Sequence, residues 1–312
     1  MDHYRRDRGY GTGICHCRQR PDAALCACRP RRLAELAAGR GRACLKNIVE
    51  GETDLTVELF PAGALGNEDE LVAQAQEGLT QVVMVSGAMS KVCKAASVLD
   101  IPYTFPSAPV AWEVLDGAFG RELAQHCLDE TGLRTLAYGE TGFRNFTNNT
   151  RAIRTPADME GLKFRVQPIP LYIEMVEGLG GEPTPIAWGE VYSALQLGTI
   201  DAAEAQPTAI WNAKLYEVIK NVTKTGHIQL VTALVVGAQA WDELSPENQK
   251  IVRDLAVENG RYASGLTIEL GEKALADVAA SGVEVSEVDL APFKEAVAPV
   301  YQMLDLEAEA KI

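Results

Sequence analysis

The chain has 312 residues, of which 47% are hydrophobic and 23% charged, with a formal net charge of −14. This length leaves room for two α/β domains that each bury a core. The negative charge argues against nucleic acid or an anionic membrane surface as a partner. No apolar run approaches the roughly 18 residues that would suggest a membrane helix, so the composition is typical of a soluble globular protein.

Residues 1–44 differ from the rest of the chain. They contain ten arginines, no lysine, only four acidic residues and five of the seven cysteines. The stretches "CHC" (15–17) and "CAC" (26–28) offer zinc or copper ligands, but their spacing is not C-x₂-C and no hydrophobic framework surrounds them. An apolar signal-peptide core is not recognisable either. We expect residues 1–44 to be an aberrant or disordered segment that binds no metal, as after a frameshift or a misplaced start codon.

Regular patterning begins at Leu45. Residues 54–63 alternate like a strand that runs into a Pro-Gly turn, and residues 67–79 form a helical pattern with Asn67 as its N-cap. A buried strand over 80–87, an apolar segment interrupted by Pro102, two short helices and a further strand near Leu136 follow. Cys93 and Cys127 lie in this part, and the sequence does not decide whether they form a disulfide.

The second half continues the alternation of helix and strand, with strands near Phe164, Ile200 and Leu230. This alternation predicts parallel sheets covered by helices, with ligands beyond the carboxyl ends of the strands. Residues 245–282 form a helical pattern of unusual length. Three glycines, at 260, 265 and 271, weaken it, so we expect a kink or a break.

One arginine lies inside an apolar strand pattern, "LKFRVQPI" (162–169). A guanidinium in a protein interior is costly unless a partner compensates its charge. Either an acid of the chain, such as Glu174 or Glu204, pairs with Arg165, or a carboxylate comes from outside. The pattern alone leaves both interpretations open.

Several linked motifs bear on this choice, and they extend from about Leu45 to Leu304. They are "VELFPAGALG", "VLDIPYTF", "GFRNFTNN", "RTPADMEGLKFRV", "GGEPTPIAWGEVYSALQLGTIDAAEAQP", "KLYEVIKNVTKTGH" and "LSPENQKIV". In this order and spacing they resemble the substrate-binding proteins of tripartite ATP-independent periplasmic (TRAP) transporters, of the dicarboxylate-binding type. That family normally has a first strand before the first helix, which residues 1–44 do not supply recognisably.

The resemblance implies an α/β, two-lobed fold like that of periplasmic binding proteins, with hinge-linked domains and a long C-terminal helix that bridges them. We expect lobe I to contain residues 45–140 and about 224–250, and lobe II residues 141–223 and about 263–312. The bridging helix would cover about 246–279. Hinges are expected near Gly139–Gly142 and Thr223–Gly226, where small residues can absorb backbone rotation.

The resemblance also implies a binding site. Arg165 would pair with the ligand's carboxylate through two parallel hydrogen bonds, Arg144 would be a second cleft arginine and Trp188 would pack on the ligand's carbon chain. Glu204 is retained from the family's pattern, whereas Ala205 replaces its asparagine, which leaves the substrate open. The remaining candidate ligand-binding residues are Gln206, Asn148, Phe105 and Tyr192. No cofactor and no metal are expected.

The implied function is the capture of a small organic acid between two lobes for TRAP membrane subunits, by a periplasmic monomer that does not bind nucleic acid. A ligand sensor of the same fold is one alternative. Another is a small-molecule enzyme that uses Glu204 as a base and Arg165 as an anchor, although a carboxylate beside an arginine is a weak base. The sequence has no G-x-S-x-G, Walker A or H-E-x-x-H motif, so we do not expect an enzyme.

Overall fold

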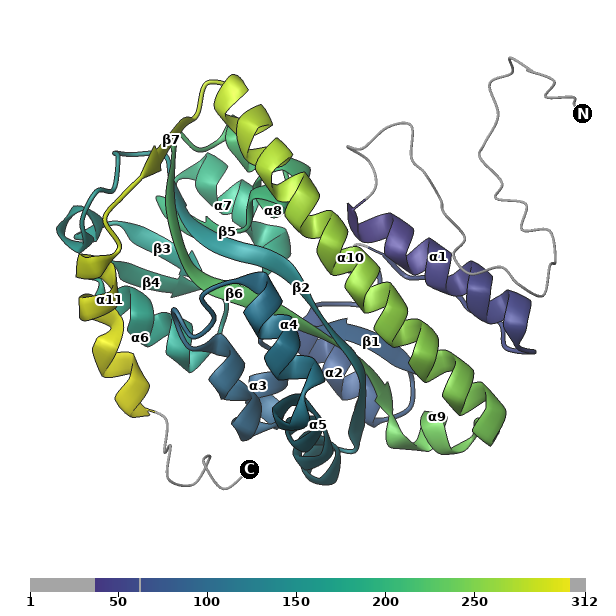
Figure 1. Ribbon diagram of the computed structural model, residues 1–312. Coiled ribbons are helices and arrows are strands. Elements are labelled where there is room, and N and C mark those ends of the chain that lie inside the picture. Colours follow the sequence, from purple (N-terminus) through teal and green to yellow (C-terminus); the bar gives the residue numbers. More distant parts are fainter. Residues whose placement is uncertain (1–36, 62, 304–312) are drawn as a thin grey trace, which may run out of the picture.

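The computed structural model describes residues 37–61 and 63–303 and has a mixed seven-stranded sheet with helices on both faces (Figure 1). The strand order is β1-β6-β2-β5-β3-β4, and β7 pairs with β6. The strands are β1 (Val82–Val85), β2 (Leu133–Asn148), β3 (Lys163–Val166), β4 (Glu182–Pro185), β5 (Ala202–Ala205), β6 (Asn221–Gly237) and β7 (Glu284–Glu287).

The helices and 3₁₀ turns lie between these strands. They are α1 (Ala37–Glu52), α2 (Glu68–Gln76), α3 (Met89–Val92), η1 (Lys94–Asp100), α4 (Ala108–Asp116), α5 (Ala118–Thr131), η2 (Pro156–Met159), α6 (Pro170–Gly178), η3 (Trp188–Glu190), α7 (Val191–Leu197), α8 (Pro207–Asn212), η4 (Leu215–Glu217), α9 (Ala238–Asp242), α10 (Pro246–Ala280), α11 (Ala291–Val297) and η5 (Ala298–Met303). Among the described residues, none of these helices is long and apolar enough to cross a membrane.

Two long antiparallel strands, β2 and β6, connect the two lobes. They pair from Leu133↔Gly237 at one end to Asn148↔Asn221 at the other. Lobe I surrounds the first end and contains β1 and α2–α5, whereas lobe II surrounds the second and contains β3, β4, β5 and α6–α8 (Figure 1). The two-lobed α/β architecture predicted from the sequence is therefore confirmed, and the residue limits of each lobe stay a prediction.

The pairing of β2 with β6 is irregular where the lobes meet. Its register shifts between Glu140 and Phe143 and again between Arg144 and Phe146. Gly142 and Gly226 have positive φ angles of 97° and 52°, which a side chain would disfavour. Bulges of this kind bend a strand and change the direction of its side chains. The irregular region coincides with the segments predicted to be hinges.

The expectation of parallel sheets is wrong for half of the sheet. The pairs β3–β4, β3–β5 and β6–β7 are parallel, but β1–β6, β2–β5 and β2–β6 are antiparallel. The cause is that β2 and β6 run the length of both lobes in opposite directions. Helix–strand alternation in the sequence does not reveal this direction.

The strand predicted over residues 54–63 is also absent from the described part of the chain. Residues 55–61 form no ladder, and β1 pairs with β6 alone. A strand requires a neighbour for its backbone N–H and C=O groups. Alternation of apolar residues over 54–59 therefore does not by itself produce a strand. The metal and disorder predictions were made for residues 1–44, of which residues 1–36 lie outside the described residues and residues 37–44 form the start of helix α1.

The long helix α10 lies along β2 and contacts α8 and α1, so it spans both lobes (Figure 1). It begins at the N-cap Ser245, whose hydroxyl accepts a hydrogen bond from the Asn248 N–H. The helix is continuous over 35 residues, so the predicted break is wrong. One of its glycines has a packing reason: a Cβ on Gly260 would lie 3.0 Å from the carbonyl oxygen of Tyr138 in β2. Glycine here permits close helix–sheet contact.

A disulfide joins Cys93 to Cys127, with Cα atoms 5.3 Å apart. Cys93 follows α3 and Cys127 lies in α5, and both are buried in the core of lobe I. The bond therefore holds two helical segments of one lobe together and leaves the junction between the lobes free. Disulfides of this kind persist in oxidising compartments outside the cytoplasm.

Candidate functional site

Two arginines are almost fully buried where the lobes meet. Arg165 in β3 and Arg144 in β2 are each 2% exposed. Phe164 and Val166, the neighbours of Arg165, belong to the hydrophobic core of lobe II. Because side chains alternate along a strand, Arg165 is directed away from that core. Since buried cations require compensation, the surroundings of these two residues indicate what the site can do.

Arg144 is compensated inside the protein. Its Nε and Nη2 atoms contact the carboxylate of Glu204 in the neighbouring strand β5, with Nη2 at 2.6 Å from Oε1. Nη2 also lies 2.6 Å from the backbone oxygen of Glu204. Glu204 is completely buried. Both members of the pair are thus held by charge-assisted hydrogen bonds within the fold.

His227 completes this buried cluster. Its ring stacks on Phe146 with centroids 4.1 Å apart, and its Nε2 lies 3.8 Å from Oε2 of Glu204. Burial, together with the positive charge of Arg144, holds the pKa of His227 well below its usual value. The imidazole is therefore neutral at pH 7, and its enclosed, stacked position indicates a structural role.

Arg165 is not compensated in the same way. Its Nε donates to the backbone oxygen of Ile186 at 3.0 Å, and its guanidinium carbon lies 5.5 Å from the ring centroid of Trp188. Among the described residues no carboxylate lies within 4.0 Å of it, and its buried Nη1 has no hydrogen-bond partner. Neither Glu174 nor Glu204 pairs with it.

The pKa of Arg165 reflects this environment. Burial, with a smaller contribution from the positive charge of Arg144, lowers it to about 9. The guanidinium is still protonated at pH 7. The result is a charged donor group that is enclosed by protein and lacks an acceptor for one of its nitrogens.

Lobe I supplies the opposite wall of the site. The hydroxyl of Tyr172, in α6 of lobe II, donates to Oδ1 of Asp100, at the end of η1 in lobe I, at 3.2 Å. Gly87, which follows β1, lies so close that a Cβ on it would collide with Ile169 and would lie 3.4 Å from Oδ1 of Asp100. Direct contacts therefore close lobe I against lobe II at this position.

The wall formed by lobe I is acidic. Burial raises the pKa of Asp100 to about 6. Glu68, in the first turn of α2, accepts hydrogen bonds from the backbone N–H of Ser86 at 3.1 Å and from its hydroxyl at 2.8 Å. The charges of Glu68 and Arg144 act on Asp100, so these groups are neighbours. Glu68 and Asp100 of lobe I thus lie near Arg165 and the Arg144–Glu204 pair of lobe II.

The other predicted site residues have separate positions. Trp188 is 40% exposed beside Arg165. Gln206 is buried and donates from Nε2 to the hydroxyl of Thr141. Phe105 is half-buried in the loop before α4. The structure thus brings Arg144, Arg165, Trp188 and Glu204 together.

Two of the predicted ligand-binding residues, Asn148 and Tyr192, make hydrogen bonds within the protein. Oδ1 of Asn148 accepts from the N–H groups of Thr150 and Arg151, each at 2.9 Å, and so stabilises a turn. The hydroxyl of Tyr192 donates to Glu217 at 2.8 Å.

Sequence reasoning missed Asp100, Glu68 and Tyr172. An acid that ends the apolar run "ASVLD" was the available signal for Asp100.

The chain matches a protein family over most of its length. The model of the bacterial extracellular solute-binding proteins, family 7, matches residues 42–307. The 2,3-diketo-L-gulonate-binding periplasmic protein of Escherichia coli is 33% identical over 264 residues, which are 84% of this chain and 80% of that protein. The C4-dicarboxylate-binding periplasmic protein of Rhodobacter capsulatus is 30% identical over 273 residues, 84% of this chain and 81% of that protein.

Solved structures agree with this assignment. A TRAP periplasmic solute-binding protein from Sulfitobacter, with bound β-D-galacturonate, superposes with a TM-score of 0.85 at 31% identity, over 89% of this chain and 93% of that one. A second from Polaromonas, bound to D-erythronate, has a TM-score of 0.83 at 30% identity, over 87% and 90% of the two chains. The chain is therefore a member of family 7 of the bacterial extracellular solute-binding proteins, the family of TRAP solute-binding proteins.

Proposed function

We propose that this protein captures a small organic acid in the cleft between its lobes and that Arg165 binds the acid's carboxylate. The observation that carries the proposal is the buried Nη1 of Arg165, which has no partner among the described residues. A carboxylate accepts two parallel hydrogen bonds from a guanidinium and compensates its charge. Entry of the ligand would thus remove the cost of burying Arg165.

The neighbouring residues would orient the ligand. Trp188 packs against the guanidinium and offers an apolar face to the ligand's carbon chain. Arg144 is held by Glu204, so we propose that it adds a hydrogen bond to the ligand at most. Gln206 and Phe105 are further contact candidates, whereas the turn and surface contacts of Asn148 and Tyr192 favour structural roles.

Closure would follow from rotation of the lobes at the irregular part of β2 and β6, near Gly142 and Gly226. A ligand that contacts both walls favours the closed form, because it binds that form more tightly than the open one. The contact between Tyr172 and Asp100 marks the closed arrangement.

The relatives suggest the destination of the acid. Their names and structures place them in the periplasm and in TRAP transport systems. By family membership we propose that this chain works as a periplasmic monomer that passes its ligand to TRAP membrane subunits. Uronates, D-erythronate and C4-dicarboxylates are the relatives' ligands and define the set of acids to test.

A binding role fits the site better than catalysis. The proposed base of an enzyme, Glu204, is completely buried and already bound to Arg144, so no substrate proton can reach it without breaking that pair. Recovery of every bound acid unchanged after prolonged incubation would agree with this. A chemically altered acid would contradict it.

A thermal-shift screen over organic acids tests the proposed function. An acid that binds only the folded protein raises the melting temperature by mass action. Arg165→Ala should lose the shift, whereas Arg121→Ala, which removes an exposed arginine of α5, should retain it. If no small acid shifts the melting temperature of the unaltered protein, or if Arg165→Ala responds like the unaltered protein, the proposal is wrong.

A further inference from the structure

The two sides of the proposed cleft differ in how many of their charged groups lack a counter-charge. In lobe II, the charge of Arg144 is neutralised by Glu204. Of the two buried arginines described above, Arg165 is therefore the one whose charge is available to a ligand. In lobe I, both oxygens of Glu68 accept from Ser86. Asp100 is the acid of this wall that retains free acceptor capacity.

Asp100 is enclosed but not neutralised. Its side chain is 4% exposed, and no lysine, arginine or histidine nitrogen of the described residues lies within 4.0 Å of it. The Tyr172 hydroxyl donates to one of its oxygens. An ionised carboxylate offers about four acceptor positions, so the group can accept further hydrogen bonds.

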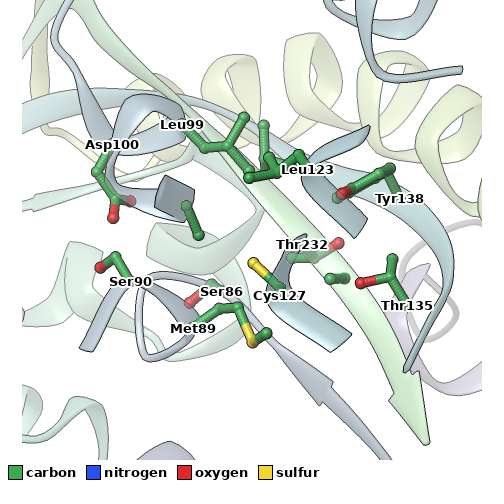
Figure 2. A pocket seen from close by; sticks show the side chains of 13 residues that line it. Ser86, Met89, Ser90, Leu99, Asp100, Leu123, Cys127, Thr135, Tyr138 and Thr232 are labelled. Atoms are coloured by element: carbon green, nitrogen blue, oxygen red, sulfur yellow. The ribbon is translucent and has the colours of Figure 1, made fainter. Parts of the chain in front are cut away.

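Figure 2 shows the surroundings of Asp100 on the side of lobe I. Asp100 and Ser90 lie together at one end of a cavity, away from Tyr138 and Thr135 at the other end. The cavity has a volume of about 20 Å³, which is room for a single water molecule. It is too small for an organic acid, so a ligand could reach Asp100 only from the side of Tyr172, where lobe II contacts it.

We propose that Asp100 is a specificity-determining residue that selects hydroxylated monocarboxylates and rejects dicarboxylates. The carboxylate at one end of the ligand would bind Arg165, and a hydroxyl group toward the other end would donate to Asp100. This inference rests on the proposed function and names the substrate class of the same site.

The selection follows from the balance of charge. One ligand carboxylate neutralises Arg165. A second carboxylate in the same cleft would find Arg144 already paired and would lie near Asp100 and Glu68, since both acids act electrostatically on the region of the arginines. Like charges in an enclosed site repel strongly, whereas a hydroxyl is neutral and can donate. Rejection through an unpaired charge is a common source of specificity.

Matched acids test the inference. D-gluconate and D-glucarate differ in whether carbon 6 is a hydroxymethyl group or a carboxylate, and D-erythronate and meso-tartrate differ in the same way at carbon 4. Calorimetry at pH 7.5 should show at least ~10-fold tighter binding of the monocarboxylate in whichever pair binds. In Asp100→Asn the ratio should fall to within about threefold, because the dicarboxylate gains affinity and the monocarboxylate loses some.

The control is Asp129→Asn, the same chemical change at an exposed position of α5, which should leave the ratio as in the unaltered protein. Equal or tighter binding of the dicarboxylates by the unaltered protein would overturn the inference, and this result does not depend on the folding of a variant. A folded Asp100→Asn protein with an unchanged ratio would also overturn it. If Arg165→Ala loses all binding while one of these two results is found for Asp100, the inference about Asp100 is wrong but the proposed function still holds.

Binding of none of the four acids, in a protein that also gives no response in the thermal-shift screen, would overturn both the proposed function and the role of Asp100. The two failures are thus distinguishable.

Discussion

Arg144 and Glu204 form an ion pair with exposed fractions of 2% and 0%, and this pair joins the two strands β2 and β5. Such a pair contributes little net stability compared with apolar residues, but removing one partner leaves the other as a buried, uncompensated charge. The pair therefore supports the site only as long as both Arg144 and Glu204 are present.

We expect Glu204→Gln to destabilise the protein by ~3–5 kcal/mol, because Arg144 would stay buried without a counter-charge. Urea denaturation at pH 7 measures this difference. The matched control is Asp254→Asn, which breaks an exposed pair with Lys250 and should change the free energy of unfolding by less than ~0.5 kcal/mol. A Glu204→Gln variant as stable as the control would contradict the assigned role.

Arg165 allows a sharper test than its removal. Arg165→Lys keeps the positive charge but replaces a planar fork by a point charge, so it should lose most of the affinity for the identified acid. Calorimetry should give a dissociation constant at least ~30-fold weaker for Arg165→Lys, corresponding to about 2 kcal/mol. Near-native affinity of this variant would rule out two-pronged recognition and leave simple charge attraction.

Asp100 should make folding stability depend on pH. Its pKa in the folded protein, about 6, lies above the value of 3.8 for an exposed aspartate. The unfolded chain therefore releases this proton at lower pH than the folded protein does. Stability is unaffected below pH ~4 and is lost as the pH rises toward 6, by up to ~3 kcal/mol.

Asp100→Asn cannot ionise and keeps a hydrogen-bond acceptor for Tyr172. The variant should gain stability relative to the unaltered protein at pH 7 but not at pH 4, as measured by urea denaturation at both values. Glu68, Arg144 and Tyr172, which face Asp100, are present in both proteins. An equal difference at the two pH values would show that Asp100 titrates normally.

The disulfide gives a prediction confined to lobe I. Cys93 and Cys127 are 34 residues apart, and cross-linking a loop of this length stabilises by ~3–4 kcal/mol in the chain-entropy model. Cys93→Ala with Cys127→Ala should lower stability by about this amount while affinity for the acid stays within a few-fold. The bond itself can be checked by labelling free thiols in the denatured, unreduced protein and mapping the labelled peptides. Labelling of both Cys93 and Cys127 would contradict the disulfide.

Particular residues show what the sequence could predict. The motifs around Arg165 and Arg144 specified the family, and hence the two lobes and the long helix α10. The strand over 54–63 was predicted wrongly because alternation describes one chain segment, whereas a strand also requires a partner. The glycines of α10 favoured a break, but close packing of Gly260 on β2 outweighs its low helix propensity.

The acidic wall was not predictable in the same way. Asp100 and Tyr172 are separated by 72 residues and meet only because the lobes close on each other. Nothing in the local sequence around either residue records that contact. An isolated acid at the end of an apolar run is the weak signal that remains, and it does not tell a buried cleft residue from a solvated turn.

Closure of the lobes is the last prediction. Two hydrogen bonds join other parts of the chain to the η1 region of lobe I: one from Tyr172 in α6 to Asp100, and one from the Tyr301 hydroxyl in η5 to the Pro102 backbone oxygen at 3.0 Å. Because Arg165 is enclosed here without its counter-charge, the ligand-free protein should populate an open form in which water solvates the guanidinium. Small-angle scattering should therefore show a smaller radius of gyration when the identified acid is added to the unaltered protein.

Arg165→Ala should show no change at the same acid concentration, and Tyr172→Phe should need more acid for the same compaction. An unchanged radius with a confirmed tight ligand would mean that the cleft is closed beforehand, and capture by hinged closure would have to be abandoned.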